Sequence, residues 1–325
     1  MRYLLGLLLV GAILWTGWWA LAGFGMRQAI DAWLVERRAE GWQAEVSALD
    51  AGGFPSTIET SLRNLALADP ETGVAVSLDP LVVSASAVWP GDVTIRLPDS
   101  PMQFSAPDAK STLTLQNGRL SIELHAGTDL ELESLRATSN AWEISGPAGA
   151  MASAEALEAT MVQAAVPTDY AITVAAPGVM PGPALRAQIA VPADWPIAFD
   201  ALSLSADVTF DQPWSRAAIE EQRPQPRAID LHLAEAAWGD LRLAVAADLT
   251  IGADGAAEGL VSVQARNWSV MLDLAEQAQL LPTGLRDQAE WVLSSLANAS
   301  GNPETIDVQL SLSGGFIRLG LIPLA

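Results

Sequence analysis

Residues 241–251 read LRLAVAADLTI, and apolar side chains occupy every second position from Leu241 to Ile251. Because successive side chains of a β-strand point to opposite faces of the sheet, this pattern predicts a strand with one buried and one solvated face. A slip of one residue would turn every large apolar side chain to the wrong face, so we expect a well-fixed register.

Short turn sequences on both sides extend this strand into a meander. Gly239-Asp240 precedes it and Asp254-Gly255 follows it, and such pairs supply the backbone conformations of tight hairpin turns. Residues 229–265 are therefore predicted to form three antiparallel strands. Further on, Gly314-Gly315 predicts a hairpin between a strand at 305–312 and a last strand at 316–321.

The same alternation recurs earlier in the chain, at residues 93–97, 120–125 and 202–210. Asn117-Gly118 predicts a hairpin that pairs residues 111–116 with residues 119–125. The clearest strands define a candidate apolar sheet face for binding. Its residues are Leu202, Leu204, Val208, Phe210, Leu241, Leu243, Val245 and Leu249.

The predicted fold class is mainly β (α+β): a long curved antiparallel meander sheet with few helices, preceded by an N-terminal transmembrane helix. Helices are expected at residues 267–280, with Asn267 as N-cap, and at residues 285–296, with Trp291 on the apolar side. Proline-rich segments interrupt the strand pattern, since proline cannot lie inside a central strand. The β-rich domain, residues 42–325, is therefore expected to have either one body or two lobes with a boundary near 177–196.

The N-terminal region predicts a membrane anchor. Residues 3–26 carry no charge, and about 20 apolar residues suffice to cross a hydrocarbon core of about 30 Å. Trp15, Trp18 and Trp19 fit the aromatic belt at the far interface. We expect a transmembrane anchor at 1–24 and an amphipathic helix at 25–41, with the N-terminus cytoplasmic and the bulk of the chain in the periplasm.

A cleaved signal peptide is the alternative interpretation of this region. Ala20-Leu21-Ala22 fits the small-x-small pattern for cleavage after Ala22, and Arg2 supplies a minimal charged region. The apolar run is longer than the usual core of a signal peptide, about 7–15 residues, which favours the uncleaved anchor. Both interpretations export the chain.

Composition excludes one class of partner. The 325 residues carry a formal net charge of −21, and Lys110 is the only lysine, so basic patches for nucleic acid are not expected. The chain has no cysteine, which fits either a reducing compartment or an exported protein that relies on its core. A chain of this length can bury a sufficient core without disulfides or metals.

No catalytic, cofactor-binding or metal-binding constellation is found in the sequence, and the chain is expected not to be an enzyme. His125 and His232 lie on the polar faces of their predicted strands. Asp129, Glu131 and Glu133 alternate as strand residues on one face would, and they form the best candidate for a cation or a hydrolase site. A solvated strand face in an acidic protein is the favoured explanation, because Ca²⁺ needs about 6–8 convergent oxygens and an extended strand splays its carboxylates.

Several short motifs carry a family resemblance. They are Gly52-Gly53-Phe54-Pro55-Ser56, Val88-Trp89-Pro90-Gly91, Ala237-Trp238-Gly239-Asp240-Leu241 and the closing run from Gly315 to Leu324. In this order behind an apolar N-terminal segment, they resemble the domain of unknown function 2125 (DUF2125) family of alphaproteobacteria over nearly the whole chain. The resemblance implies an exported protein of a Gram-negative bacterium. Together with the predicted anchor, this leads us to expect a single pass through the inner membrane. It supplies no catalytic residues.

The architecture is also loosely similar to the AsmA-like envelope proteins, whose curved sheets form apolar troughs for lipids. A sheet with one apolar face must cover it with helices, a second sheet, its own curvature or a ligand, and few helices are expected here. The leading hypothesis is a membrane-anchored periplasmic protein whose curved sheet binds lipid or another apolar envelope component. The alternative is a non-catalytic scaffolding protein of the envelope whose apolar face is consumed by its own core.

Overall fold

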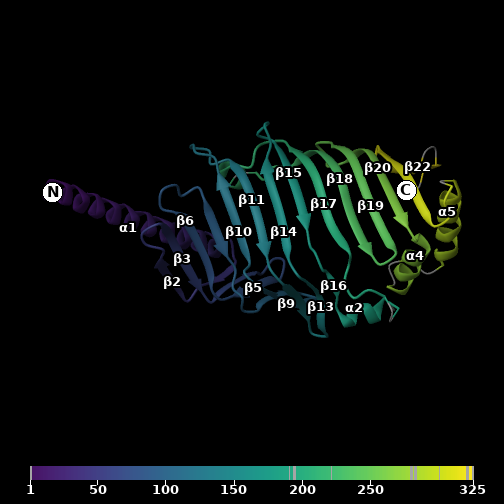
Figure 1. The fold of residues 1–325 in the computed structure, drawn as a ribbon, viewed down its shortest axis with the longest axis horizontal. Coiled ribbons are helices and arrows are strands. Elements are labelled where there is room, and N and C mark those ends of the chain that lie inside the picture. The colour runs from purple at the N-terminus through teal and green to yellow at the C-terminus, as the bar shows by residue number, and fades with distance from the viewer. Residues whose placement is uncertain are drawn as a thin grey trace. The chain divides into compact units, whose positions relative to one another are not determined.

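The computed structural model describes residues 2–189, 191–192, 195–220, 222–278, 281, 284–299, 301–319 and 322–323. The chain divides into two compact units (Figure 1). Unit 1 comprises residues 1–126 and 137–140, and unit 2 comprises residues 127–136 and 141–325. The lobe boundary expected near 177–196 stays a prediction.

Unit 1 begins with one long helix, α1 (Arg2–Ala39), which is continuous across the two segments expected from the sequence. Its C-terminal third is amphipathic, as expected. Leu34 is buried with Leu62 and Leu65 of the sheets, and Ile30 packs against the same cluster. This packing fixes the end of α1 to the β-structure of unit 1, and Gly41, at a φ of 94°, follows the helix.

Two antiparallel sheets make up the rest of unit 1. The first, in order of pairing, consists of β2 (Ala48–Gly52), β3 (Thr57–Arg63), β6 (Leu81–Ser86), β7 (Val93–Arg96) and β10 (Arg119–Leu124). The second consists of β1 (Gln43–Glu45), β4 (Leu65–Asp69), β5 (Val74–Leu78), β8 (Met102–Ala106) and β9 (Ala109–Leu115). Apolar side chains of both sheets contribute to one buried cluster.

The chain of unit 1 alternates between these two sheets in pairs of strands. The hairpin expected at Asn117-Gly118 is therefore wrong, because β9 pairs with β8 in one sheet and β10 pairs with β7 in the other. Asn117 does adopt a positive φ of 54°, so the sequence correctly signals a turn. The turn leads the chain from one sheet to the other and does not fold a strand back onto its neighbour.

Unit 2 contains the predicted meander. Its main sheet runs through β14 (Leu157–Gln163), β15 (Asp169–Ala175), β17 (Ala201–Phe210), β18 (Pro226–Trp238), β19 (Leu241–Ile251), β20 (Ala257–Arg266), β21 (Thr305–Ser313), β22 (Phe316–Leu319) and β23 (Ile322–Pro323). A second set of paired strands consists of β12 (Trp142–Gly146), β13 (Gly149–Ala154) and β16 (Met180–Pro181). Strand β11 (Leu132–Ser139) has residues in both units.

The hairpins expected around residues 229–265 are confirmed, as is the hairpin at Gly314-Gly315. Gly239, Gly255, Gly314 and Gly315 all have positive φ, as tight turns of this kind require. Residues 320, 321, 324 and 325, at the end of the predicted last strand and of the closing motif, lie outside the described residues.

Helices occupy few positions in unit 2, as expected. They are α2 (Pro183–Gln188), α3 (Arg216–Glu220), α4 (Trp268–Gln277) and α5 (Arg286–Ala299). Asn267 is the N-cap residue of α4, as expected, but its backbone is left-handed and its side chain makes no cap bond; its Nδ2 instead donates to the Asp240 carbonyl. The predicted position of Trp291 is wrong. Its side chain is 73% exposed, and the apolar side of α5 is formed by Ala289, Leu293 and Ala297.

Candidate functional site

The register of the main sheet in unit 2 aligns apolar side chains into rows that cross the strands. The first row consists of Leu202, Ala236, Leu243, Ala265 and Ile306, and the second of Val174, Leu204, Ala234, Val245, Val263 and Val308. The third consists of Ile172, Ala206, Leu231, Ala247, Val261 and Leu310. Directly paired side chains share one face, so these rows build a continuous apolar face.

The opposite face is polar, and a bulge in β18 preserves the separation. Leu231 pairs with Ala206 and Leu233 pairs with Ser205, so His232 is the extra residue. The bulge changes the phase of alternation and turns Leu233 onto the polar face, where it is exposed. His232 lies on this strand with its Nε2 3.2 Å from an oxygen of Asp207 and 3.6 Å from an oxygen of Asp230.

An open groove of about 290 Å³ lies over the first two rows. Four of the residues expected to form the apolar face line it, namely Leu202, Leu204, Leu243 and Val245, together with small side chains of β15 and β18. Leu202 is 39% exposed and Leu243 is 36% exposed. Large aliphatic side chains on a sheet face are therefore left without protein cover at this position.

The other four predicted residues lie around the groove and do not line it. Val208 and Leu241 are buried, so their side chains are packed in the protein and are not accessible to a ligand. Leu249 pairs with Ile229 farther along the same face. Phe210 belongs to an aromatic cluster, where its ring contacts the rings of Tyr170 and Trp214 edge to face, at centroid distances of 5.8 and 5.6 Å.

Protein segments cover the apolar face on either side of the groove. Helices α4 and α5 cover the rows where they reach β20 and β21, because Trp268, Leu272 and Ala297 bury Ala265 and Ile306. Along β15, a second cluster joins Ala176 to Val179 and Phe199. The space left uncovered is thus a short groove and not the whole face.

Tyr170 is a buried residue of β15 that links three segments at the end of the sheet beyond the apolar rows. Its side chain is 1% exposed, and its hydroxyl donates to the Leu132 carbonyl at 3.3 Å and accepts from the Trp214 amide at 3.2 Å. Burial raises the pKa of the Tyr170 hydroxyl above its ordinary value, against the opposing effects of the hydrogen bonds from the Trp214 amide and from Gln163. Tyr170 therefore joins β15, the start of β11 and the connection after β17.

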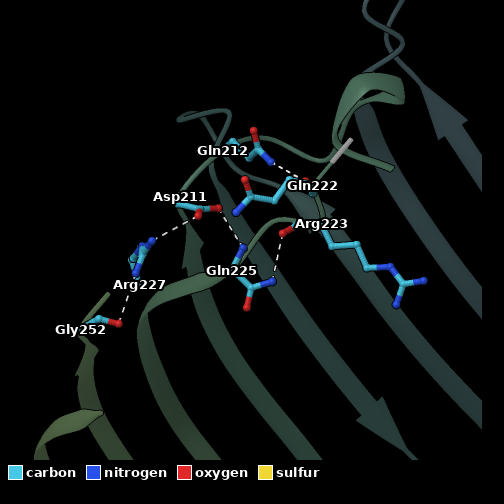
Figure 2. A network of polar contacts seen from close by, with 7 residues as sticks. All are labelled: Asp211, Gln212, Gln222, Arg223, Gln225, Arg227 and Gly252. Atoms are coloured by element: carbon cyan, nitrogen blue, oxygen red, sulfur yellow. Dashed lines mark hydrogen bonds and ion pairs between the residues drawn. The ribbon is translucent and has the colours of Figure 1, made fainter. Parts of the chain in front are cut away.

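Polar contacts fix that connection between β17 and β18 (Figure 2). Asp211 accepts from the Gln225 amide at 2.8 Å and forms an ion pair with Arg227 at 3.3 Å, so the two ends of the connection are held together. Gln212 donates to the Gln222 carbonyl at 2.6 Å. Arg227 also donates to the Gly252 carbonyl, in the next hairpin. Most of these contacts join the two ends of the connection that contains Trp214, and the bond to Gly252 ties it to the next hairpin.

Asp129, Glu131 and Glu133 do not alternate along one strand as expected. Asp129 lies in a bend, and Leu130 has a φ of 47°, so β11 begins only at Leu132 and the expected strand alternation is broken. Within the described ranges, no group of three or more metal-ligating side chains is placed to hold a metal ion. His125 is exposed beyond the end of β10.

Helix α1 contains a segment, Leu5–Ala39, that is long and apolar enough to cross a membrane, and its most apolar stretch has no buried residue.

Two features of the molecule were missed from the sequence. The first is the switching of strand pairs between two sheets, which does not alter the local period of two. The second is the aromatic cluster, because Tyr170 is distant in sequence from Phe210, whose ring it contacts, and from Trp214, whose ring contacts Phe210.

No curated protein matches the chain. A family model described as "Uncharacterized protein conserved in bacteria (DUF2125)" matches residues 19–325, which confirms the resemblance seen in the short motifs. The match includes all the strands and the second half of α1. The chain therefore belongs to the DUF2125 family.

Proposed function

We propose that this chain is a single-pass inner-membrane protein whose periplasmic β-rich body binds lipid or another apolar envelope component in the groove of unit 2. Residues 3–26 of α1 hold it in the membrane, with the N-terminus in the cytoplasm. The role is binding without catalysis. The observation that carries the proposal is the groove itself, where Leu202 and Leu243 stay exposed in a mainly aliphatic wall that also includes Ser203 and Glu235.

The size and lining of the groove suit a slender apolar ligand. Its volume of about 290 Å³ is at the low end of ligand pockets, which range over about 300–1,000 Å³. Branched aliphatic side chains with few polar groups favour the methylene groups of an acyl chain over a polar or strongly hydrogen-bonding ligand. The looser architectural similarity to the AsmA-like proteins points in the same direction, although a shared architecture does not establish a function.

A second observation supports an uncleaved anchor. The indoles of Trp15 and Trp19 donate hydrogen bonds to backbone carbonyls of Pro55 and Thr57 in unit 1, and the family match begins at residue 19. A signal peptide cut after Ala22 would remove these contacts from the folded protein. The contacts therefore favour retention of α1 in the mature chain.

Blocking the groove with a charge tests the proposal. Leu243→Glu is expected to weaken binding of a fluorescent fatty acid such as cis-parinaric acid by at least about tenfold. Desolvating a carboxylate beside an acyl chain costs well over the roughly 1.4 kcal/mol that corresponds to a factor of ten. The measurement is a fluorescence titration of the delipidated full chain, held in an amphipathic polymer.

Leu260→Glu is the matched control, because Leu260 is an exposed leucine that pairs with Asp248 on the polar face of the same sheet. Lipids extracted from both purified variants are compared by mass spectrometry with those from the unmodified chain. Lipids that surround α1 are common to all three and provide the baseline. Equal lipid content and equal probe binding in all three would contradict the proposal and favour the scaffolding alternative.

A further inference from the structure

Three indoles of α1 are bonded to the loops at one edge of unit 1. Trp15 Nε1 donates to the Pro55 carbonyl at 3.0 Å, and Trp19 Nε1 donates to the Thr57 carbonyl at 2.6 Å. Trp18 Nε1 donates to the Ala87 carbonyl at 3.0 Å. Pro55 lies in the connection from β2 to β3, Thr57 is the first residue of β3, and Ala87 lies in the connection from β6 to β7, so both loops are fixed against the same part of α1.

The position of these indoles along α1 sets their depth in a bilayer. The uncharged run starts at Tyr3, and a core of about 30 Å takes about 20 residues, so it ends near residue 23. At a rise of about 1.5 Å per residue, Trp15 and Trp19 lie about 18 and 24 Å from Tyr3. They are therefore within the last part of the core, and the loops bonded to them are at the same depth.

Hydrogen-bond pairing agrees with this depth. An indole N–H or a backbone carbonyl left without a partner in hydrocarbon costs several kcal/mol, as an order of magnitude. Each of the three bonds satisfies a donor of α1 and an acceptor of a loop at once. Irregular backbone is tolerated at membrane depth only when its polar groups are satisfied by protein in this way.

The two loops also have the composition of a membrane-inserting surface. Residues 51–58 and 80–91 contain no charged residue, in a chain whose formal net charge is −21. At their tips, Phe54 is 55% exposed and Val88 is 79% exposed. The Phe54 ring contacts the Trp19 ring edge to face at 5.4 Å, so the apolar surface of α1 continues onto the loop.

We infer that the loops at residues 53–55 and 87–89 insert into the outer leaflet of the inner membrane, with Phe54 and Val88 among the acyl chains of the phospholipids. This inference rests on the proposed retention of α1 in the membrane. The partner is the acyl region of a lipid bilayer, because the surface is uncharged and continuous with the membrane-spanning helix. Insertion seats unit 1 partly in the bilayer instead of on a flexible tether above it.

Single cysteines provide the test, since the chain has none of its own. Phe54→Cys and Val88→Cys are labelled with a nitroxide in the full chain, reconstituted in vesicles of phosphatidylcholine and phosphatidylglycerol. Leu14→Cys, on the exposed surface of α1, is the reference for the anchor. Val74→Cys is the matched control, because Val74 is an exposed apolar residue of unit 1 in the sheet that does not contain these loops.

The labels at positions 14, 54 and 88 are expected to be relaxed strongly by oxygen and weakly by a water-soluble nickel chelate, and the label at position 74 is expected to show the reverse. If the label at position 14 is relaxed mainly by oxygen while those at 54 and 88 are relaxed mainly by the nickel chelate, the inference about the loops is wrong and the proposal that α1 is a membrane anchor is supported. If position 14 also reports water, the anchor and the inference both fail. If position 74 reports lipid as well, insertion is not confined to these loops and the inference is overturned.

Discussion

Replacing Tyr170 with alanine is expected to destabilise unit 2 by about 3–5 kcal/mol, the range for removing a buried aromatic ring. The ring fills the space beside Phe210, and its hydroxyl bonds to Leu132 and Trp214. Truncation therefore leaves a cavity together with unpaired backbone groups. Urea unfolding of the full chain in detergent, followed by tryptophan fluorescence, measures the change, and the neighbouring indole of Trp214 makes the signal sensitive to this site.

Two further variants separate the causes. Tyr170→Phe keeps the ring and removes only the hydroxyl, so a smaller loss of about 1–3 kcal/mol is expected from the hydrogen bonds left unmade. Trp291→Ala removes a larger ring from an exposed position and is expected to change stability by no more than about 0.5 kcal/mol. A loss for Trp291→Ala equal to that for Tyr170→Ala would contradict this account of the core.

The raised pKa of Tyr170 predicts a loss of stability at alkaline pH. Below the ordinary pKa of tyrosine, near 10, both the folded and the unfolded states keep the proton and the stability is unaffected. As pH rises above that value, the unfolded state ionises first, so the contribution is lost as pH approaches the higher folded pKa. Tyr170→Phe is expected to remove this part of the pH dependence.

Replacing Gly259 with alanine is expected to destabilise the sheet by about 3 kcal/mol or more, from a strained dihedral and a backbone clash together. Gly259 has a φ of 142°, and a Cβ there would lie 2.0 Å from the Asp248 carbonyl oxygen of the neighbouring strand β19. The pairing of β19 with β20 must open to admit it. Urea unfolding of the full chain in detergent again provides the measurement.

Gly255→Ala is the control for this clash. Gly255 also has a positive φ, of 82°, but a Cβ there meets no atom within 4 Å. It therefore carries only the conformational cost of a left-handed alanine, about 1–3 kcal/mol. If both variants lose the same stability, close approach between β19 and β20 does not explain the requirement for glycine at position 259.

Alternation of period two predicted the strands of unit 2 and which side chains share a face, because in a meander each strand pairs with the next one in sequence. Leu202, Leu204, Leu243 and Val245 were found in this way. The extent of the groove was not predictable, since Val208 and Leu241 have the same local pattern and differ only in what covers them. The bulge at His232 also escapes prediction, because Leu231 and Leu233 continue the alternation in sequence while they lie on opposite faces.

Helix predictions were correct in position and wrong in detail for the same physical reason. Asn267 has the residue type of an N-cap, but the acceptor offered by Asp240 lies 27 positions away in sequence. Trp291 is the largest apolar residue of its helix, yet the side of α5 that faces β21 is filled by smaller residues. Contacts with residues distant in sequence determine both the hydrogen bond of Asn267 and the packed side of α5, and the local sequence does not reveal such contacts.

Helices α4 and α5 cover the apolar rows at β20 and β21, and the proposed groove is lined by residues within 174–245 and does not extend over those two strands. A hydrocarbon chain in the proposed groove is therefore expected to stay on these strands and not to continue along the apolar rows over β20 and β21. In the proposed function, the small volume of the groove limits it to one ligand, so occupancy is expected to saturate at one hydrocarbon chain per protein.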